Sequence, residues 1–213
     1  MIQDVLGIYR DRSDDFIRYF FEHLHIVFVS VSIVAFIGLG LGIAMTYSRR
    51  LASVVLAVSG FLYTIPSIAM FGILVFITGI GNTSAIVAIS IYGALPLIRN
   101  TYVGLKEVDA SILEAATGMG STEAQLLFRI KLPLATPVIM AGFRTTLVMM
   151  IALGGIASFI GAGGLGVPIW AGIAINNRAL TIAGSLLVAL LAVVTDVLMG
   201  FIERFLRLKL HGK

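Results

Sequence analysis

Three glycines near the end of the chain have the spacing of a nucleotide-binding loop. Gly161, Gly163 and Gly166 satisfy G-x-G-x-x-G, in which glycines let the backbone approach a pyrophosphate where a parallel strand leads into a helix. Here the motif follows an apolar run, and the next acidic residue is Asp196, inside another apolar run. We therefore reject a dinucleotide site and expect these glycines to make tight backbone turns.

Other residue types that support catalysis or metal binding do not form a recognisable set. The sequence has no G-x-x-x-x-G-K-[ST] loop for nucleotide phosphates and no cysteine, which excludes disulfides and thiolate ligands. His23, His25 and His211 are scattered, and no serine has a histidine and an acid arranged as a nucleophilic triad requires. We expect no catalytic residue, no metal site and no cofactor on this chain, and so no enzyme.

The composition is that of a membrane protein. Of the 213 residues, 59% are hydrophobic and 12% are charged, whereas soluble domains carry about a quarter charged residues. The net charge of +4 does not indicate nucleic acid, because the basic residues lie at the ends of apolar runs and in a central polar segment. The first 23 residues mix acidic and basic side chains, unlike a signal peptide, so the first apolar run is expected to remain as an anchor.

Apolar runs long enough to cross a bilayer recur along the chain, since about 20 helical residues span the hydrocarbon core. The predicted spans cover about residues 24–47, 51–80, 84–103, 137–159 and 180–202. The second run contains Pro66 and is too long for one upright helix, so we predict one long or kinked span, with two half-helices as the alternative. A glycine-rich loop and a short stretch around Trp170 precede the last span.

The orientation follows from the basic residues, which are in excess in cytoplasmic loops. They gather at Arg49 and Arg50, at Lys106, Arg129 and Lys131, and at Arg204, Arg207, Lys209 and Lys213. Five spans place all three groups in the cytoplasm, with the amino terminus outside and the carboxyl terminus inside. We therefore predict an all-α transmembrane bundle of about five spans forming one domain over residues 1–213, with a core at 24–204 and a cytoplasmic loop at 106–135.

The polar segment after the third span predicts two short helices that meet at a sharp corner. Asp109 or Ser111 can cap the first helix, and Ser111 with Glu114 has the form of a capping box. Gly118 and Gly120 end it, and Gly120 suits the left-handed position beyond a helix end. The apolar face of this first helix carries Ile112, Leu113, Ala116 and Met119.

The second helix of this segment starts at another capping box. Thr122 and Gln125 have the required spacing, and the helix is expected to run up to Pro133. Its apolar face carries Leu126, Leu127 and Ile130. Such a pair of helices can dock into a groove of another protein or lie on lipid headgroups, and the residues alone leave both open.

The segment resembles the EAA loop of permease subunits from ATP-binding-cassette (ABC) importers. The matching residues are Glu114, Ala115, Ala116, Gly120, Ile130, Leu132 and Pro133. The stretches YTIPS at 63–67, ALPLIRNTYVGL at 94–105 and IGAGGLG at 160–166 are similar to permeases of quaternary-amine osmoprotectant importers. The resemblance implies the type I importer permease fold and a coupling helix held in a cleft of a separate ATPase, with the seven matching residues coupling the two.

The same resemblance suggests candidates for a translocation path. They are Phe61, Tyr63, Pro66, Tyr92, Gly161, Gly163 and Gly164. Aromatic faces attract quaternary ammonium groups, although aromatic residues in spans also pack against neighbouring helices. Among intramembrane charges, we expect Arg99 and Arg144 to reach headgroups or helix-end carbonyls, and Asp196 to form a hydrogen bond or ion pair within the bundle.

Taken together, the sequence predicts a bacterial plasma-membrane permease that imports glycine betaine, carnitine or choline. The partners that the resemblance implies are ABC ATPase subunits that use ATP and Mg²⁺, a second permease, identical or a sister, and an extracytoplasmic substrate-binding protein. Two alternatives stay open. One is an ABC permease for methionine or another amino acid, and the other is a carrier or channel that works without an ATPase.

Overall fold

The computed structural model describes residues 2–211, with side chains up to Lys209, and all its regular elements are helical. Lys213, counted above among the basic tail residues, lies outside this part of the chain. The helices are α1 (Ile2–Asp11), α2 (Ser13–Tyr47), α3 (Arg49–Thr64), α4 (Ser67–Thr78), α5 (Asn82–Lys106), α6 (Ala110–Gly118), α7 (Glu123–Gln125), α8 (Leu132–Ala157), α9 (Gly166–Ala174) and α10 (Arg178–His211). A π-helix (Leu126–Lys131) joins α7 to α8, and a 3₁₀ turn (Ser158–Ile160) ends α8.

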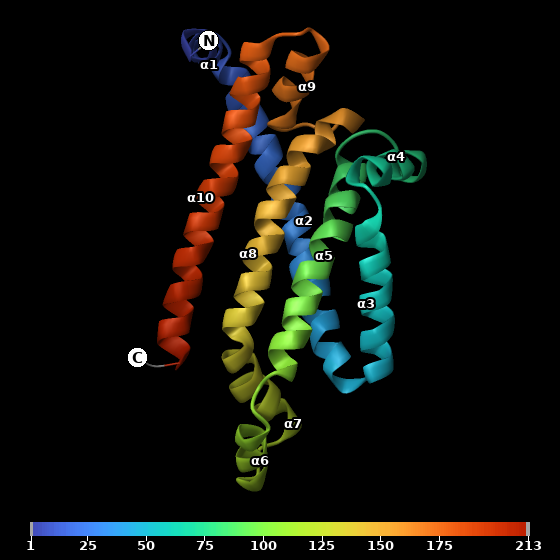
Figure 1. Cartoon of the computed structure of the whole chain (residues 1–213), viewed down its shortest axis with the longest axis vertical. Coiled ribbons are helices and arrows are strands. Elements are labelled where there is room, and N and C mark those ends of the chain that lie inside the picture. Colours follow the sequence, from blue (N-terminus) through green and yellow to red (C-terminus); the bar gives the residue numbers. More distant parts are fainter. Residues whose placement is uncertain (1, 212–213) are drawn as a thin grey trace.

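The long helices α2, α3, α5, α8 and α10 run roughly parallel (Figure 1). The short helices α1, α4 and α9 lie at one end of this bundle, with the amino terminus. The α2–α3 turn, α6, α7 and the carboxyl-terminal end of α10 lie at the other. The three predicted basic groups therefore belong to segments at one end of the molecule, as five crossings require.

Four helical runs in the described chain are individually long and apolar enough to cross a membrane, and α3 with α4 passes the same test as a bent pair. The predicted all-α bundle of about five spans is therefore confirmed. The second run, however, is not one kinked helix, because α3 and α4 meet at 100°. The two-helix alternative describes it.

The bend falls where the chain chemistry requires a break. Pro66 has no N–H to donate and disfavours helical geometry in the residue before it, and Ile65 is extended, with φ −67° and ψ 128°. The Tyr92 hydroxyl on α5 donates a hydrogen bond to the freed carbonyl of Ile65. The break is thus satisfied by a neighbouring span, as buried backbone in a membrane demands.

Three of the predicted spans are shorter than the helices that contain them. The first long helix begins at Ser13 instead of about residue 24, with Asp14 and Asp15 in its first turn, where carboxylates favour the positive end of the helix dipole. The last helix continues to His211 instead of residue 202. The fourth begins well before residue 137, because α7, the π-helix, α8 and the 3₁₀ turn form one run from Glu123 to Ile160. We call this run the rod.

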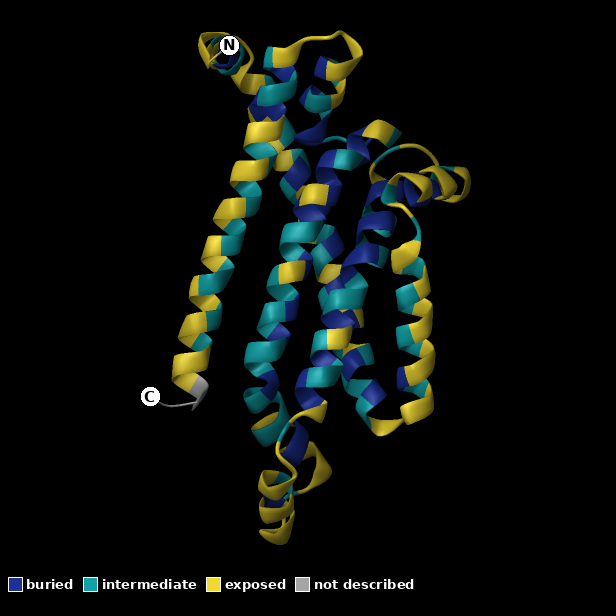
Figure 2. Cartoon of the chain, viewed as in Figure 1, coloured by how far each residue is buried: buried dark blue, intermediate teal, exposed yellow. Residues whose placement is uncertain are grey.

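Close helix approach through small residues makes the core, in which α5 lies between α2 and α8. A Cβ added at Gly42 of α2 would stand 2.5 Å from the Thr101 side chain, and one at Gly142 of α8 would stand 2.5 Å from Asn100. Small residues at such points let spans pack backbone to backbone. Figure 2 shows the result, with buried residues concentrated along α5 and exposed ones along α10 and at the α6 end.

Candidate functional site

The predicted corner after α5 is present and projects from the bundle (Figure 1). Helix α6 is capped by Asp109, whose carboxylate accepts a hydrogen bond from the Ser111 backbone N–H at 2.8 Å. This bond lowers the pKa of the Asp109 carboxyl. Of the two proposed caps Asp109 is the right one, so the Ser111–Glu114 capping box was wrong. Glu114 is instead free to face outward, and its side chain is exposed.

Gly120 makes the turn that ends α6. Its φ of +86° is in the left-handed region, as predicted. The Gly120 N–H donates to the Thr117 carbonyl at 2.9 Å, and the Ser121 N–H donates to the Ala116 carbonyl at 3.1 Å. This pair of bonds is a Schellman motif, which satisfies the last carbonyls of a helix. The corner, by which we mean residues 110–122, is therefore a fixed turn.

The second predicted capping box is confirmed. The Gln125 backbone N–H donates to Thr122 Oγ1 at 3.3 Å, and the Thr122 N–H donates to Gln125 Oε1 at 2.9 Å. The helix that begins here does not stop at Pro133. Just before this proline the backbone forms a π-helix, in which the Leu132 N–H donates a hydrogen bond to the Leu127 carbonyl, five residues earlier. Proline has no N–H of its own to donate. The helix nevertheless continues through Pro133.

The seven predicted coupling residues therefore divide into two groups. Glu114, Ala115 and Gly120 are exposed at the corner, and Ala116 is buried beneath it. Ile130, Leu132 and Pro133 are half-buried in the first turns of the rod, where they support the corner and offer less surface to a partner.

The structure adds exposed apolar side chains to this surface. Met119 and Phe128 leave 88% and 65% of their surfaces exposed, and Ile112 leaves 43%. Met119 and Ile112 belong to the predicted apolar face of α6, whereas Phe128 was missed, although its place in a charged segment outside the predicted spans was a signal. Large exposed apolar side chains on a segment outside the spans are candidates for a protein–protein contact.

The aromatic path candidates do not form one cage. The rings of Tyr63 and Tyr92 meet edge to face with centroids 6.0 Å apart, and the Tyr63 hydroxyl lies 3.5 Å from the Met149 sulfur. Tyr92 is buried and serves the bend at Pro66, as described above. Phe61 leaves 67% of its surface exposed on α3. Packing thus accounts for Tyr92, while Tyr63 and Phe61 keep an accessible face.

The glycine loop is fastened to α2 and α5 through its backbone. The Gly163 N–H donates to Asn82 Oδ1 and the Gly164 N–H donates to Glu22 Oε2, each at 3.0 Å. A Cβ at position 163 would stand 2.5 Å from the Glu22 carboxylate, and Gly161 and Gly164 have φ of +75° and +99°. The expected tight turns are confirmed, and the close fit explains the glycine spacing. The contacts with Glu22 and Asn82 were not foreseen.

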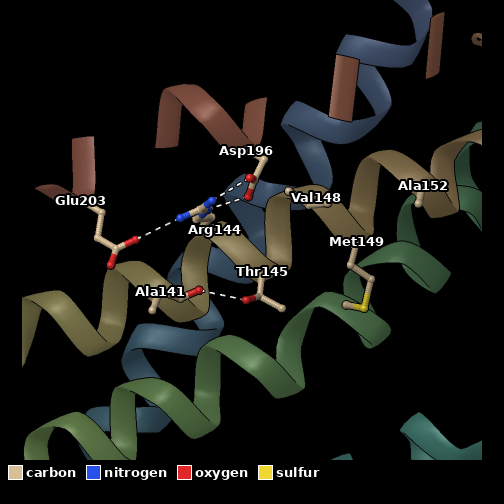
Figure 3. A pocket seen from close by; sticks show the side chains of 8 residues that line it. All are labelled: Ala141, Arg144, Thr145, Val148, Met149, Ala152, Asp196 and Glu203. Carbon is tan, nitrogen blue, oxygen red and sulfur yellow. Dashed lines mark hydrogen bonds and ion pairs between the residues drawn. The ribbon is translucent and has the colours of Figure 1, made fainter. Parts of the chain in front are cut away.

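The charged residues within the predicted spans have different surroundings. Arg144 does not reach headgroups but pairs with Asp196 of α10, which confirms the ion pair expected for that aspartate and corrects the role expected for Arg144. Figure 3 shows both with Glu203 at the edge of a cavity between α8 and α10. Arg99 is exposed on α5. Within the described residues, no three His, Asp or Glu side chains are placed to hold a metal ion.

The chain is similar to known membrane transport proteins in sequence and in fold. The model of the family described as binding-protein-dependent transport system inner membrane component matches residues 36–208. The chain is 40% identical over 203 residues to the glycine betaine/carnitine/choline transport system permease protein OpuCD of Bacillus subtilis (strain 168), covering 94% of this chain and 89% of that protein.

Two further similarities bear on sequence and fold. The carnitine transport permease protein OpuCD of Listeria monocytogenes serotype 1/2a (strain 10403S) is 36% identical over 206 residues, covering 96% of this chain and 92% of that protein. A chain of the MetNI methionine ABC transporter, from a crystal structure of its inward-facing conformation, superposes with a TM-score of 0.81 at 25% identity. The match covers 92% of this chain and 98% of that chain.

Proposed function

Because the chain belongs to the family of binding-protein-dependent transport system inner membrane components, we propose that it works as the permease of an importer driven by a separate ATPase. Membership makes it a multi-pass membrane transport subunit and not an enzyme. The observation that carries the coupling role is the corner, a capped and rigid turn outside the bundle that presents Glu114, Ala115 and an apolar patch. ATP and Mg²⁺ would be used in the partner.

We assign the substrate class to quaternary-amine osmoprotectants, namely glycine betaine, carnitine and choline. Relatives named for these solutes share 36–40% identity over nearly the whole chain, against 25% for the methionine transporter. The methionine reading rests on likeness of fold, which many cargoes share. Osmoprotectants are therefore the better supported cargo.

The proposed orientation puts the corner in the cytoplasm. The α2–α3 turn and the end of α10 share one end of the bundle with the corner, and each of these two segments carries an excess of Lys or Arg, which cytoplasmic loops favour. The amino terminus, α9 and the glycine loop then face outward. An extracytoplasmic receptor would deliver substrate at that end, and the ATPase would bind at the other.

At the docking surface, Glu114, Ala115 and Gly120 would enter a cleft of the ATPase, and Ala116 would support them from beneath. Ala115 lets a partner backbone approach closely, and the exposed Glu114 offers a carboxylate to a basic group. Ile130, Leu132 and Pro133 would act as the support that passes the load into the rod. Met119 and Phe128 add apolar area, which supplies affinity in such contacts.

We also propose that two permeases, identical or sister chains, enclose the path. A second chain is needed to close a pathway that one bundle of this size lines poorly. Of the path candidates, Tyr63 and Phe61 keep accessible faces, Pro66 sets the bend beside them, and Tyr92 holds that bend. Gly161, Gly163 and Gly164 would shape the outer entrance.

Co-purification followed by reconstitution tests this function. The tagged chain should bring down an ATP-binding subunit, and proteoliposomes of the complex with its receptor should take up radiolabelled glycine betaine only with ATP. Choline or carnitine should compete, and methionine should not. Competition by methionine alone would favour the amino-acid alternative, and substrate flux through the lone chain would overturn the proposal in favour of an independent carrier.

A further inference from the structure

An arginine on the rod is held by a shaped cradle on α10. Arg144 Nε and Nη2 donate to the two carboxylate oxygens of Asp196 at 2.5 and 2.6 Å, and Nη1 lies 3.6 Å from Glu203 Oε2 (Figure 3). The two acids are seven residues apart and so share one face of α10. A two-pronged contact of this kind fixes the direction of the arginine as well as its distance.

Gly200 completes the cradle. It lies between the two acids, and a Cβ built there would stand 3.2 Å from Arg144 Nη1 and 3.4 Å from Cζ. Any side chain at this position would therefore crowd the guanidinium. We call Arg144, Asp196, Gly200 and Glu203 the α10 clip.

The clip attaches a part of α10 that has little else to hold it. The amino-terminal end of this helix is packed, since Leu180 and Ala183 are buried and the Tyr9 hydroxyl donates to the Ala183 carbonyl at 2.7 Å. Val188, Leu191 and Ala192 then lean on the central core. Among residues 185–209, however, none is buried, so beyond Ala192 the clip is the polar link between α10 and the rod.

The charged side chains of the clip are suited to hold two membrane helices together. Arg144, Asp196 and Glu203 keep 35%, 41% and 28% of their side chains accessible, and they border a cavity of about 570 Å³ between α8 and α10. Charges within a membrane span are costly unless paired, and removing one partner leaves the other uncompensated. Separation of α10 from the rod is thus opposed more strongly than an exposed ion pair would oppose it.

The rod links this clip to the corner. Arg144 lies on the same helical run as Gln125, which caps the start of the rod beside Gly120. About 19 residues of helix separate the two, roughly 28 Å at 1.5 Å per residue. Since the run has no non-helical break, a displacement at the corner moves Arg144 as well, and through it α10.

We propose that Arg144, Asp196 and Glu203 are positioning residues for energy coupling, which make α10 move together with the rod when the ATPase pulls on the corner. The inference rests on the proposed function, because it assumes that the corner is driven by a partner. It adds that the last span is a moving part whose attachment is this clip. None of the three residues needs to touch substrate for this role.

The test compares the whole reconstituted importer with variants of the clip. In Asp196→Asn, substrate taken up per ATP hydrolysed should fall about fivefold or more, the range of ordinary coupling energies, while the complex assembles and hydrolyses ATP. The charge exchange Arg144→Asp with Asp196→Arg should recover most of the ratio. Gly200→Ala, which only crowds the guanidinium, should give a smaller loss. The matched control Asp15→Asn breaks the exposed Asp15–Arg18 pair and should change nothing.

A distance measurement separates coupling from stability. Because the chain has no cysteine, spin labels at Ala124→Cys and Arg207→Cys report the separation of the start of the rod and the end of α10. In the wild-type importer this distance should stay constant between nucleotide-free and ATP-bound states, and in Asp196→Asn or Gly200→Ala it should broaden or change.

The outcomes distinguish the two proposals. Absence of ATP-dependent uptake by the wild-type complex would refute the proposed function itself. A transporting wild type whose clip variants keep both the uptake ratio and the fixed distance would refute the clip alone. If the complex does not assemble with Asp196→Asn, the charge-exchange variant and Gly200→Ala test the clip by the same two measurements.

Discussion

At the scale of single residues, Gly120 determines the shape of the corner. Its positive φ costs an ordinary residue roughly 1–2 kcal/mol, yet the space around it is open, with no atom within 4 Å of an added Cβ. The requirement for glycine is therefore one of backbone conformation and not of room. Gly118, two residues earlier, is helical and has equally open surroundings, so the two glycines can be tested against each other.

We predict that Gly120→Val leaves the protein inserted but uncouples hydrolysis from uptake. The branched side chain resists the left-handed turn, so the Schellman bonds open and Glu114 loses its fixed position. Uptake per ATP hydrolysed in proteoliposomes is the measurement. Gly118→Ala, the control, should transport normally, and wild-type transport by Gly120→Val would count against the docking role of the corner.

Phe128 gives a second prediction at this scale. If its exposed ring contacts the ATPase, Phe128→Ser should weaken binding of the ATPase about tenfold, a modest hot-spot effect, without disturbing the fold. Affinity in detergent by titration of labelled ATPase measures it. Ile2→Ser removes an apolar group at the opposite end that is at least as exposed as Phe128, and it should have no effect. Equal affinities for both variants would remove Phe128 from the interface.

At the scale of elements, the glycine loop and the bend at Pro66 are both held by side chains from other spans. Glu22 and Asn82 accept hydrogen bonds from N–H groups of the loop, and the Tyr92 hydroxyl donates one to the Ile65 carbonyl at the bend. Local sequence rules located both breaks, because proline and closely spaced glycines interrupt helices wherever they occur. The partners could not be inferred, since they come from distant parts of the chain and depend on how the spans pack.

We predict that Gly163→Ala lowers the thermal stability of the purified protein. The added Cβ meets the Glu22 carboxylate at 2.5 Å, and overpacking of this kind costs about 1–3 kcal/mol. The melting temperature, followed by tryptophan fluorescence of Trp170 near this loop, is the observable. Gly72→Ala lies in helix α4 with open space around it and should match or exceed the wild type. A Gly163→Ala variant as stable as Gly72→Ala would mean that the loop is not clasped in solution.

At the scale of the whole molecule, hydropathy was sufficient to find the spans but not their lengths. Acidic first-turn residues extended α2 to Ser13, and the π-helix carried the fourth span back through Pro133 to Glu123, features that a count of apolar residues does not include. Helix α1 was missed because its burial depends on Leu180 and Ala183, residues of the last helix. The pairing of Arg144 with Asp196 was only half foreseen for the same reason.

The orientation of the whole bundle gives a further prediction. Gln3→Cys, at the amino-terminal end, should react with a membrane-impermeant maleimide on intact cells, because we place that end outside. Ala124→Cys, beside the corner, should react only in inside-out vesicles. Both positions are exposed, so labelling reports sidedness and not burial. The reverse pattern would place the corner outside and rule out its contact with a cytoplasmic ATPase.

The rod is longer than the membrane it crosses. Its 38 residues reach roughly 57 Å at 1.5 Å each, and about 54 Å when tilted by about 20°, against about 40–45 Å for a bilayer with its headgroups. If this surplus lies at the end that carries the corner, it forms an overhang of about 10 Å that lifts the corner clear of the headgroup layer. The proposed docking surface would then lie in bulk water, where the ATPase could bind without displacing phospholipid.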